Sequence, residues 1–201
     1  MQRLSRAAGI VAWLISSSVC LAQSTAAGSP PSWKFFESGD LYLRNEIGGN
    51  LVPDLDSGLS LDAGVAWNLA LGWQFTDFLS VEATSGVTYN TFDSLAGSPI
   101  DGSLLQVPVL GQVRFEVPLA SYVNFVVGGG AGVMYIDASS SSIPSSANWE
   151  FAYTATGGLE FPVGTGGAFG VFYRFLGTSD TSFASSGIFN QQIVASFTLR
   201  F

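Results

Sequence analysis

The sequence contains no histidine. Histidine is the commonest general base in enzymes and a frequent metal ligand, so its absence excludes His-dependent catalytic triads and His-ligated metal centres. Serine is plentiful, but no general base accompanies it to make a nucleophile. We therefore predict a non-enzymatic protein with no catalytic residue, no metal site and no cofactor.

Charged residues are also scarce. They make up 11% of the 201 residues, whereas about a quarter is usual in a soluble domain. Seven Lys and Arg residues stand against fifteen Asp and Glu residues, which gives a net charge of −8. A nucleic-acid partner requires a basic surface, so it is excluded. The hydrophobic content of 47% and the mean hydropathy of +0.37 argue against a disordered chain.

The N-terminal 22 residues have the composition of a secretory signal. Arg3 and Arg6 precede a short apolar stretch over residues 7–21, and Ala22 supplies a small residue before a cleavage site. We predict a signal peptide over residues 1–22 that is removed on export. A transmembrane anchor is the weaker alternative, because the apolar stretch is too short to span a bilayer comfortably.

The single cysteine, Cys20, lies within this segment. A lipoprotein anchor at Cys20 is disfavoured, because Val19 stands where such sites usually have a small residue. Residues 23–38 contain Pro30 and Pro31 and show no periodicity, so they are predicted to be a linker.

Beyond the linker, apolar residues alternate with small or polar residues, which is the period of a β-strand. The clearest run, over residues 61–75, is apolar at every odd position and ends in Trp73 and Phe75. The same pattern predicts eight strands, near residues 40–52, 59–75, 79–92, 103–117, 122–137, 149–161, 167–177 and 188–201.

Short and long connections alternate between these strands. The short ones are 76–78, 118–121 and 162–166, and the long ones are near 53–58, 93–102, 138–148 and 178–187. This order is typical of an up-and-down sheet, and a sheet in a membrane must close so that no backbone group is left unpaired. The sequence therefore predicts an all-β fold, an eight-stranded antiparallel up-and-down transmembrane β-barrel over residues 39–201. The short turns and both strand ends are expected on the periplasmic side.

The charged residues of these strands share the polar parity. They are Arg44, Glu46, Asp62, Glu82, Arg114, Glu116, Glu150, Glu160, Arg174 and Arg200. In a narrow membrane barrel they would face the lumen and pair with one another. A soluble ligand-carrying barrel would have to hold the many Trp, Phe and Tyr side chains inside, which its volume disfavours. Six acids against four arginines are expected to form a salt-bridge network that plugs the lumen; an ion path or proton relay is the alternative.

The C-terminal strand resembles the terminal strand of bacterial outer-membrane proteins. It ends in phenylalanine and has apolar residues at alternate positions, including Ile193, Phe197, Leu199 and Phe201. Segments 40–49, 106–110, 128–133 and 171–175 resemble parts of small barrels of the OmpA/OmpX-like and opacity-type superfamily. The resemblance implies a bacterial outer-membrane location, contact with membrane lipid, and recognition of the last strand by the barrel assembly machinery.

Three functions are compatible with this architecture. The first is a structural or surface-interaction role in the cell envelope, with loops that present a site to a surface ligand. The alternative is a small porin-like channel for ions or minor solutes. The third is a lipid-modifying barrel enzyme, which the absence of histidine disfavours.

Overall fold

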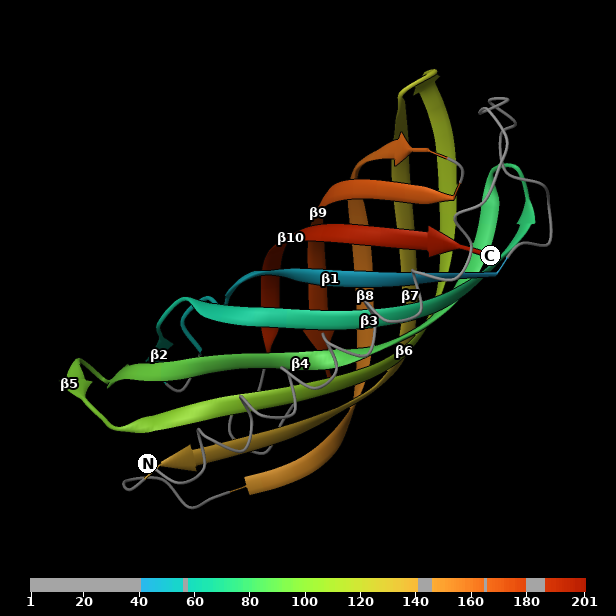
Figure 1. The fold of residues 1–201 in the computed structure, drawn as a ribbon. Coiled ribbons are helices and arrows are strands. Elements are labelled where there is room, and N and C mark those ends of the chain that lie inside the picture. The colour runs from blue at the N-terminus through green and yellow to red at the C-terminus, as the bar shows by residue number, and fades with distance from the viewer. Residues whose placement is uncertain (1–40, 56–57, 141–145, 165, 180–186) are drawn as a thin grey trace. The chain divides into compact units, whose positions relative to one another are not determined.

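A computed structural model describes residues 41–55, 58–140, 146–164, 166–179 and 187–201 (Figure 1). These residues belong to one compact unit, Trp33–Phe201. The predicted signal peptide and linker lie outside the described residues. No helix in the described ranges is long and apolar enough to cross a bilayer.

The described chain is built from strands. Their bounds are β1 Leu41–Leu51, β2 Leu59–Leu61, β3 Gly64–Thr76, β4 Leu79–Leu95, β5 Ser98–Pro99, β6 Gly102–Ala120, β7 Val123–Ser140, β8 Ser146–Val163, β9 Gly167–Thr178 and β10 Phe189–Arg200.

Eight long strands close into a ring in the order β3, β1, β10, β9, β8, β7, β6, β4, and β4 pairs back with β3. Every pairing is antiparallel, and the first and last strands meet with Tyr42 opposite Arg200 (Figure 1). Closure supplies each long strand with two neighbours, which removes the free edge that a membrane would not tolerate. The predicted all-β, eight-stranded antiparallel barrel is confirmed.

The two ends of the barrel differ. The short turns between β3 and β4, β6 and β7, and β8 and β9 lie at one end, together with the start of β1 and the end of β10. We call this the short-turn end and the opposite one the long-connection end. Strands β4, β6, β7 and β8 have 17 to 19 residues each and extend toward the long-connection end beyond their predicted limits.

Three sequence predictions need correction at the long-connection end. The run 59–75 is broken at Asp62–Ala63 into β2 and β3, because the pairing of β2 with β4 shifts at a bulge between Ser60 and Leu61. The loop predicted at 93–102 contains the end of β4, all of β5 and the first residue of β6. The loop predicted at 138–148 is shorter, since β7 runs to Ser140 and β8 begins at Ser146.

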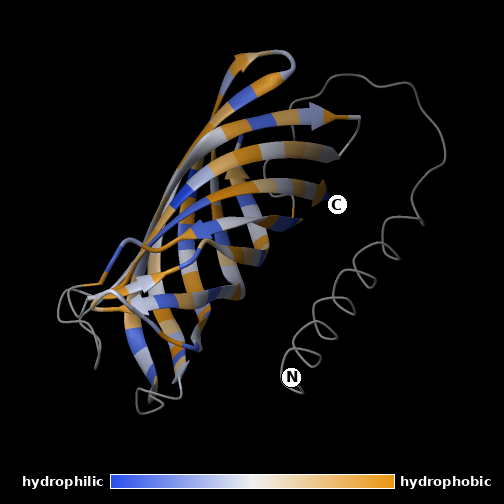
Figure 2. Cartoon of the chain, turned by 90° about the vertical axis from the view of Figure 1, so that its left-hand side faces the viewer, coloured by the Kyte–Doolittle hydropathy of each residue, from blue (hydrophilic) through white to orange (hydrophobic). Residues whose placement is uncertain are grey.

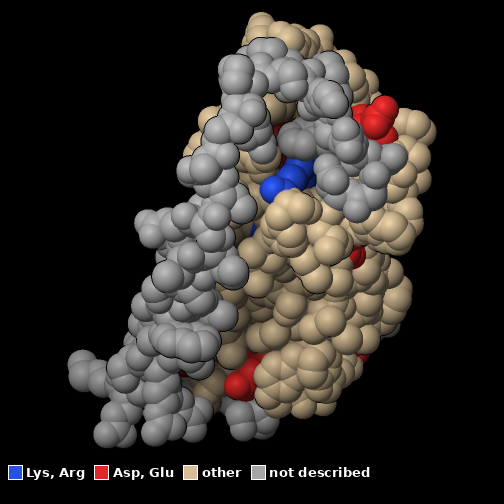
Figure 3. Space-filling model, turned by 45° about the vertical axis from the view of Figure 1, so that its right-hand side comes forward, with Lys and Arg blue, Asp and Glu red and all other residues tan. Residues whose placement is uncertain are grey.

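Alternate residues of each strand face opposite solvents. On β6, Val109, Val113 and Phe115 are exposed, whereas Gln112 and Arg114 between them are buried in the lumen. The colouring of Figure 2 alternates along the strands for this reason. Few charged side chains reach the described part of the face in Figure 3. The outer wall is therefore apolar and the polar parity lies inside, as the alternation predicts.

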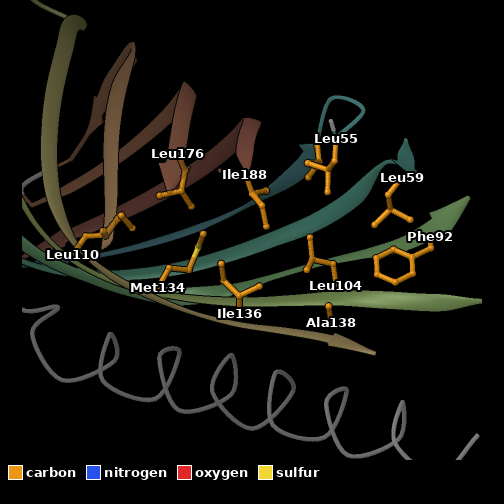
Figure 4. Packing of buried hydrophobic residues seen from close by; sticks show 12 residues of the cluster. Leu55, Leu59, Phe92, Leu104, Leu110, Met134, Ile136, Ala138, Leu176 and Ile188 are labelled. Atoms are coloured by element: carbon orange, nitrogen blue, oxygen red, sulfur yellow. The ribbon is translucent and has the colours of Figure 1, made fainter. Parts of the chain in front are cut away.

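The lumen toward the long-connection end contains a group of apolar side chains, which the sequence analysis did not predict. Its buried side chains are Val52, Leu55, Leu59, Phe92, Leu104, Leu110, Met134, Ile136, Ala138, Ala152, Leu176 and Ile188. We call this group the apolar cluster; Figure 4 shows its members from several strands pointing toward one another. Complete burial of one such leucine contributes roughly 1.5–3 kcal/mol to stability. Val52, Leu55 and Leu59 come from between β1 and β3 and are buried in this cluster.

The lumen at the short-turn end holds an aromatic ring that depends on a glycine. A Cβ atom on Gly72 of β3 would lie 2.1 Å from the Tyr42 ring, well inside contact distance. The ring cannot simply move away, because the Tyr42 hydroxyl is hydrogen-bonded to Glu82 and Ser80. Gly72 is therefore required for space rather than for an unusual backbone angle.

The substitution Gly72→Ala is expected to lower the free energy of unfolding by about 1–3 kcal/mol, the usual cost of overfilling a packed site. Gly157→Ala is the matched control, since a Cβ atom at Gly157 meets no atom within 4 Å. The control should change stability by less than about 0.5 kcal/mol. Urea unfolding of both variants in lipid vesicles measures the difference. Equal stability of the two variants would contradict this packing.

Candidate functional site

Eight charged side chains meet in the lumen toward the short-turn end, and all are directed inward. Side-chain exposure ranges from 0% to 6% across the group. Arginines and glutamates are present in equal number. They are Arg44 and Glu46 of β1, Glu82 of β4, Arg114 and Glu116 of β6, Glu160 of β8, Arg174 of β9 and Arg200 of β10. We call them the lumen ion cluster.

The eight groups form one continuous chain of ion pairs across the barrel. Each glutamate lies between two arginines, and Arg114 contacts three glutamates. In order, the closest contacts are Arg174–Glu46, Glu46–Arg44 at 3.0 Å, Arg44–Glu82 at 2.6 Å, Glu82–Arg114 at 3.3 Å, Arg114–Glu160 at 2.6 Å, Glu160–Arg200 at 3.0 Å and Arg200–Glu116 at 3.1 Å.

Four positive and four negative charges make the cluster neutral. A single buried charge without a partner costs several kcal/mol, so neutrality decides whether such a lumen can form. Because the ion pairs form a chain, the cost of burying each charge is also spread over several members of the cluster. Removal of one member leaves the cluster with a net charge, whereas removal of an arginine together with a glutamate keeps it neutral. The pair at one end of the chain is Arg174 with Glu46.

Two aromatic residues that the sequence analysis missed support the ion cluster. The Tyr42 hydroxyl donates to Glu82 Oε1 at 2.7 Å. The Phe172 ring lies below two guanidinium groups, with its centroid 5.7 Å from Arg44 Cζ and 5.3 Å from Arg114 Cζ. Such cation–π contacts stabilise a desolvated cation. The signal was available in the sequence, since Tyr42 precedes Arg44 by two positions and therefore shares its face.

Two of the predicted lumen acids do not join the ion cluster. Asp62 is exposed in the break between β2 and β3, where its carboxylate accepts a hydrogen bond from Thr91 Oγ1 at 3.2 Å. Glu150 points inward on β8 but pairs with Met134 of the apolar cluster, and no described cation lies within ion-pair distance of it. The predicted ratio of six acids to four arginines is thus corrected to four and four. Asp62 is excluded by the break between β2 and β3, and Glu150 by its position along β8, level with the apolar cluster.

A small cavity lies beside the ion cluster. Its volume is about 10 Å³, and it is lined by Arg44, Glu82, Gln112, Arg114, Val126, Gly128 and Thr156. That volume accommodates about one water molecule. Within the described ranges, no group of three His, Cys, Asp or Glu side chains is arranged to hold a metal ion.

The C-terminal residues expected to act in assembly lie on the outer wall. Ile193, Phe197 and Phe201 are 66%, 37% and 72% exposed, and Leu199 is half-buried. The Phe197 ring packs against Phe169 with centroids 4.9 Å apart. The backbone N–H of Phe201 donates to the carbonyl of Leu41 at 2.9 Å, which ties the chain end to β1. The Phe201 side chain itself contributes little packing.

The barrel is similar to solved structures of bacterial surface proteins. Ail, the attachment invasion locus protein of Yersinia pestis, crystallised with the heparin analogue sucrose octasulfate, is 18% identical at a TM-score of 0.55, over 82% of this chain and 100% of Ail. Neisserial surface protein A is 13% identical at a TM-score of 0.57, over 80% and 97% of the two chains. OprG from Pseudomonas aeruginosa is 12% identical at a TM-score of 0.51, over 82% and 97%.

The fold is that of small outer-membrane β-barrel proteins. The resemblance seen in the sequence therefore holds at the level of architecture. No protein-family model matches the chain, and a search of curated protein sequences found no match. At these identities the likeness extends to the fold and not to a ligand.

Replacing the end pair of the ion cluster tests its energetics. Arg174→Met leaves Glu46 with one arginine and the cluster with a net negative charge. This should lower stability by about 3–5 kcal/mol, the cost of breaking a buried pair. The double variant Arg174→Met with Glu46→Gln restores neutrality, so it should be more stable than Arg174→Met alone. A double-mutant cycle by urea unfolding measures the coupling. Additive losses would contradict the chain of ion pairs.

Proposed function

We propose that this chain is an exported, non-enzymatic barrel of the bacterial outer membrane with a closed lumen and a structural or surface-interaction role. The observation that carries the proposal is the combination of an apolar outer wall with a lumen filled by the neutral ion cluster. Such a barrel offers a rigid anchor in lipid and no path for solutes. The absence of histidine from the whole sequence supports the non-enzymatic part.

The distribution of aromatic side chains supports membrane insertion. Trp73, Phe78 and Tyr122 are exposed near the short-turn end, and Trp149 and Phe151 are exposed toward the long-connection end. Outer-membrane barrels carry aromatic girdles at both interfaces, where the amphipathic rings contact lipid headgroups. We therefore propose that the exposed valines, leucines and phenylalanines between the two aromatic girdles contact the lipid of the outer membrane.

We place the short-turn end in the periplasm and the long-connection end outside, because outer-membrane barrels have short periplasmic turns and long external loops. The described part of the long-connection end carries Asp54, Asp62, Asp93 and Asp101 as exposed acids and no Lys or Arg. A sulfated ligand such as the one bound by Ail would be repelled by these residues. Any surface ligand of this chain should therefore differ from that of Ail in charge.

The signal peptide is proposed to direct export and to be cleaved after Ala22, and insertion to follow recognition of the last strand by the barrel assembly machinery. The exposed side chains of Ile193, Phe197 and Phe201 support this role, since they are available on the outer wall of β10. Leu199 completes the same apolar parity.

Planar-bilayer recording tests the closed lumen. The purified folded protein should insert without steady conductance, because the lumen ion cluster and the apolar cluster fill the lumen. Insertion is verified independently by co-flotation of the protein with lipid vesicles. Steady, ohmic conductance from verified insertions would contradict the proposal and favour a porin-like channel.

Assembly is tested separately with Phe201→Ala. The variant keeps the backbone hydrogen bond to Leu41 and loses only an exposed ring. Refolding into lipid vesicles should therefore match the unchanged protein, whereas the yield of folded barrel in the outer membrane of cells should fall. Leu119→Ala, which removes an exposed apolar side chain of β6 at the same end, is the control and should leave both yields unchanged. Equal cellular yields for the two variants would exclude a signal at Phe201.

A further inference from the structure

A layer of amide side chains crosses the barrel between the lumen ion cluster and the outer part of the apolar cluster. Its members are Asn50 of β1, Gln106 of β6, and Asn190 and Gln192 of β10. All four residues have 0% of their surface exposed. We call them the amide layer. These four polar side chains belong neither to the lumen ion cluster nor to the apolar cluster.

The four amides belong to one connected group. Asn50 Nδ2 donates to Asn190 Oδ1 at 2.9 Å, and Asn50 lies opposite Gln192 in the pairing of β1 with β10. Gln192 Nε2 in turn reaches across the lumen and donates to Thr88 Oγ1 at 3.2 Å. Thr88 lies opposite Gln106 in the pairing of β4 with β6. Gln106 and Gln192 therefore approach the same threonine from two strands.

Several polar atoms of the amide layer lack a hydrogen-bond partner among the described residues. They are Oδ1 of Asn50, Nδ2 of Asn190, Oε1 of Gln192 and both Nε2 and Oε1 of Gln106. Leu104 flanks Gln106 on its own strand, and Ile136 lies opposite it on β7. A buried amide in such surroundings carries the full cost of its lost hydration, and native proteins almost always satisfy it with protein or water.

The unpaired atoms define the chemistry of an occupant. Two of them are donors and three are acceptors, so the occupant must both donate and accept hydrogen bonds. All four side chains of the amide layer are uncharged, and the nearest arginine, Arg174 opposite Gln192, is already paired with Glu46. A small neutral molecule that both donates and accepts hydrogen bonds meets these requirements. Water is such a molecule, and it needs only two to four polar partners.

We propose that the amide layer binds buried water that bridges Gln106 to the amides of β10. The hydrated layer then adjoins side chains of the apolar cluster, since Leu176 of β9 lies opposite Asn190 and Leu110 lies between Gln106 and Arg114 on β6. This inference does not depend on the membrane location or on the surface role.

The substitution Gln106→Met tests the site, since methionine has nearly the same length and no polar atom. If Gln106 binds water, the variant leaves that water and its other partners short of hydrogen bonds, and the urea midpoint of unfolding falls. If the amide is simply unpaired, the variant removes an unsatisfied group and the midpoint rises. Gln112→Met is the matched control, because Gln112 Nε2 donates to Thr84 Oγ1 at 2.8 Å and its loss must lower the midpoint.

Nuclear Overhauser measurements on the folded protein give a second readout that needs no variant. Cross-peaks between long-lived water and the side-chain amides of Gln106 and Asn190 are expected. The Asn190 cross-peak should weaken in Gln106→Met and persist in Gln112→Met. A midpoint that rises or stays unchanged in Gln106→Met overturns the proposal, and so does the absence of water cross-peaks from the unchanged protein. If Gln106→Met does not fold, the cross-peaks decide alone.

Discussion

Charge neutrality inside a narrow barrel is the constraint on which the rest of this structure depends. Four arginines and four glutamates from six strands must meet in the lumen, since a surplus of either sign would leave a buried ion unpaired. These side chains can pair only if each strand has the correct register relative to its neighbours in the ring. It also explains the space that Gly72 leaves for Tyr42, whose hydroxyl completes the environment of Glu82. The lumen ion cluster thus specifies the barrel as well as filling it.

The apolar cluster adds a closure of a different kind at the other end. Its leucines and Met134 pack together with Val52, Leu55 and Leu59, which come from between β1 and β3. The two closures rely on different interactions, ion pairs between buried groups in the first and packing of apolar side chains in the second. The likeness of this barrel to Ail and OprG is one of fold.

The sequence allowed the strands, their faces and the inward direction of the arginines to be predicted, because a period of two assigns each residue to one side of a sheet. It did not allow depth along the barrel to be predicted, since depth depends on register between strands far apart in the chain. Glu150 has the correct parity but lies level with Met134, not with an arginine. Asp62 was placed in a strand that a bulge interrupts. The apolar outer lumen was missed for the same reason, as inward leucines such as Leu104 and Leu176 gather only once the ring closes.

The most direct test of the filled lumen is chemical accessibility from water. Thr156 lines the small cavity beside Arg44 and Arg114, and cysteine is close to threonine in size. In a Cys20→Ser background, Thr156→Cys in the folded barrel should resist a charged, water-soluble thiol reagent, whereas Asp101→Cys at the exposed rim should react within minutes. Unfolding in urea should make both thiols equally reactive. Rapid labelling of Thr156→Cys in the folded barrel would show an open aqueous lumen and contradict this account.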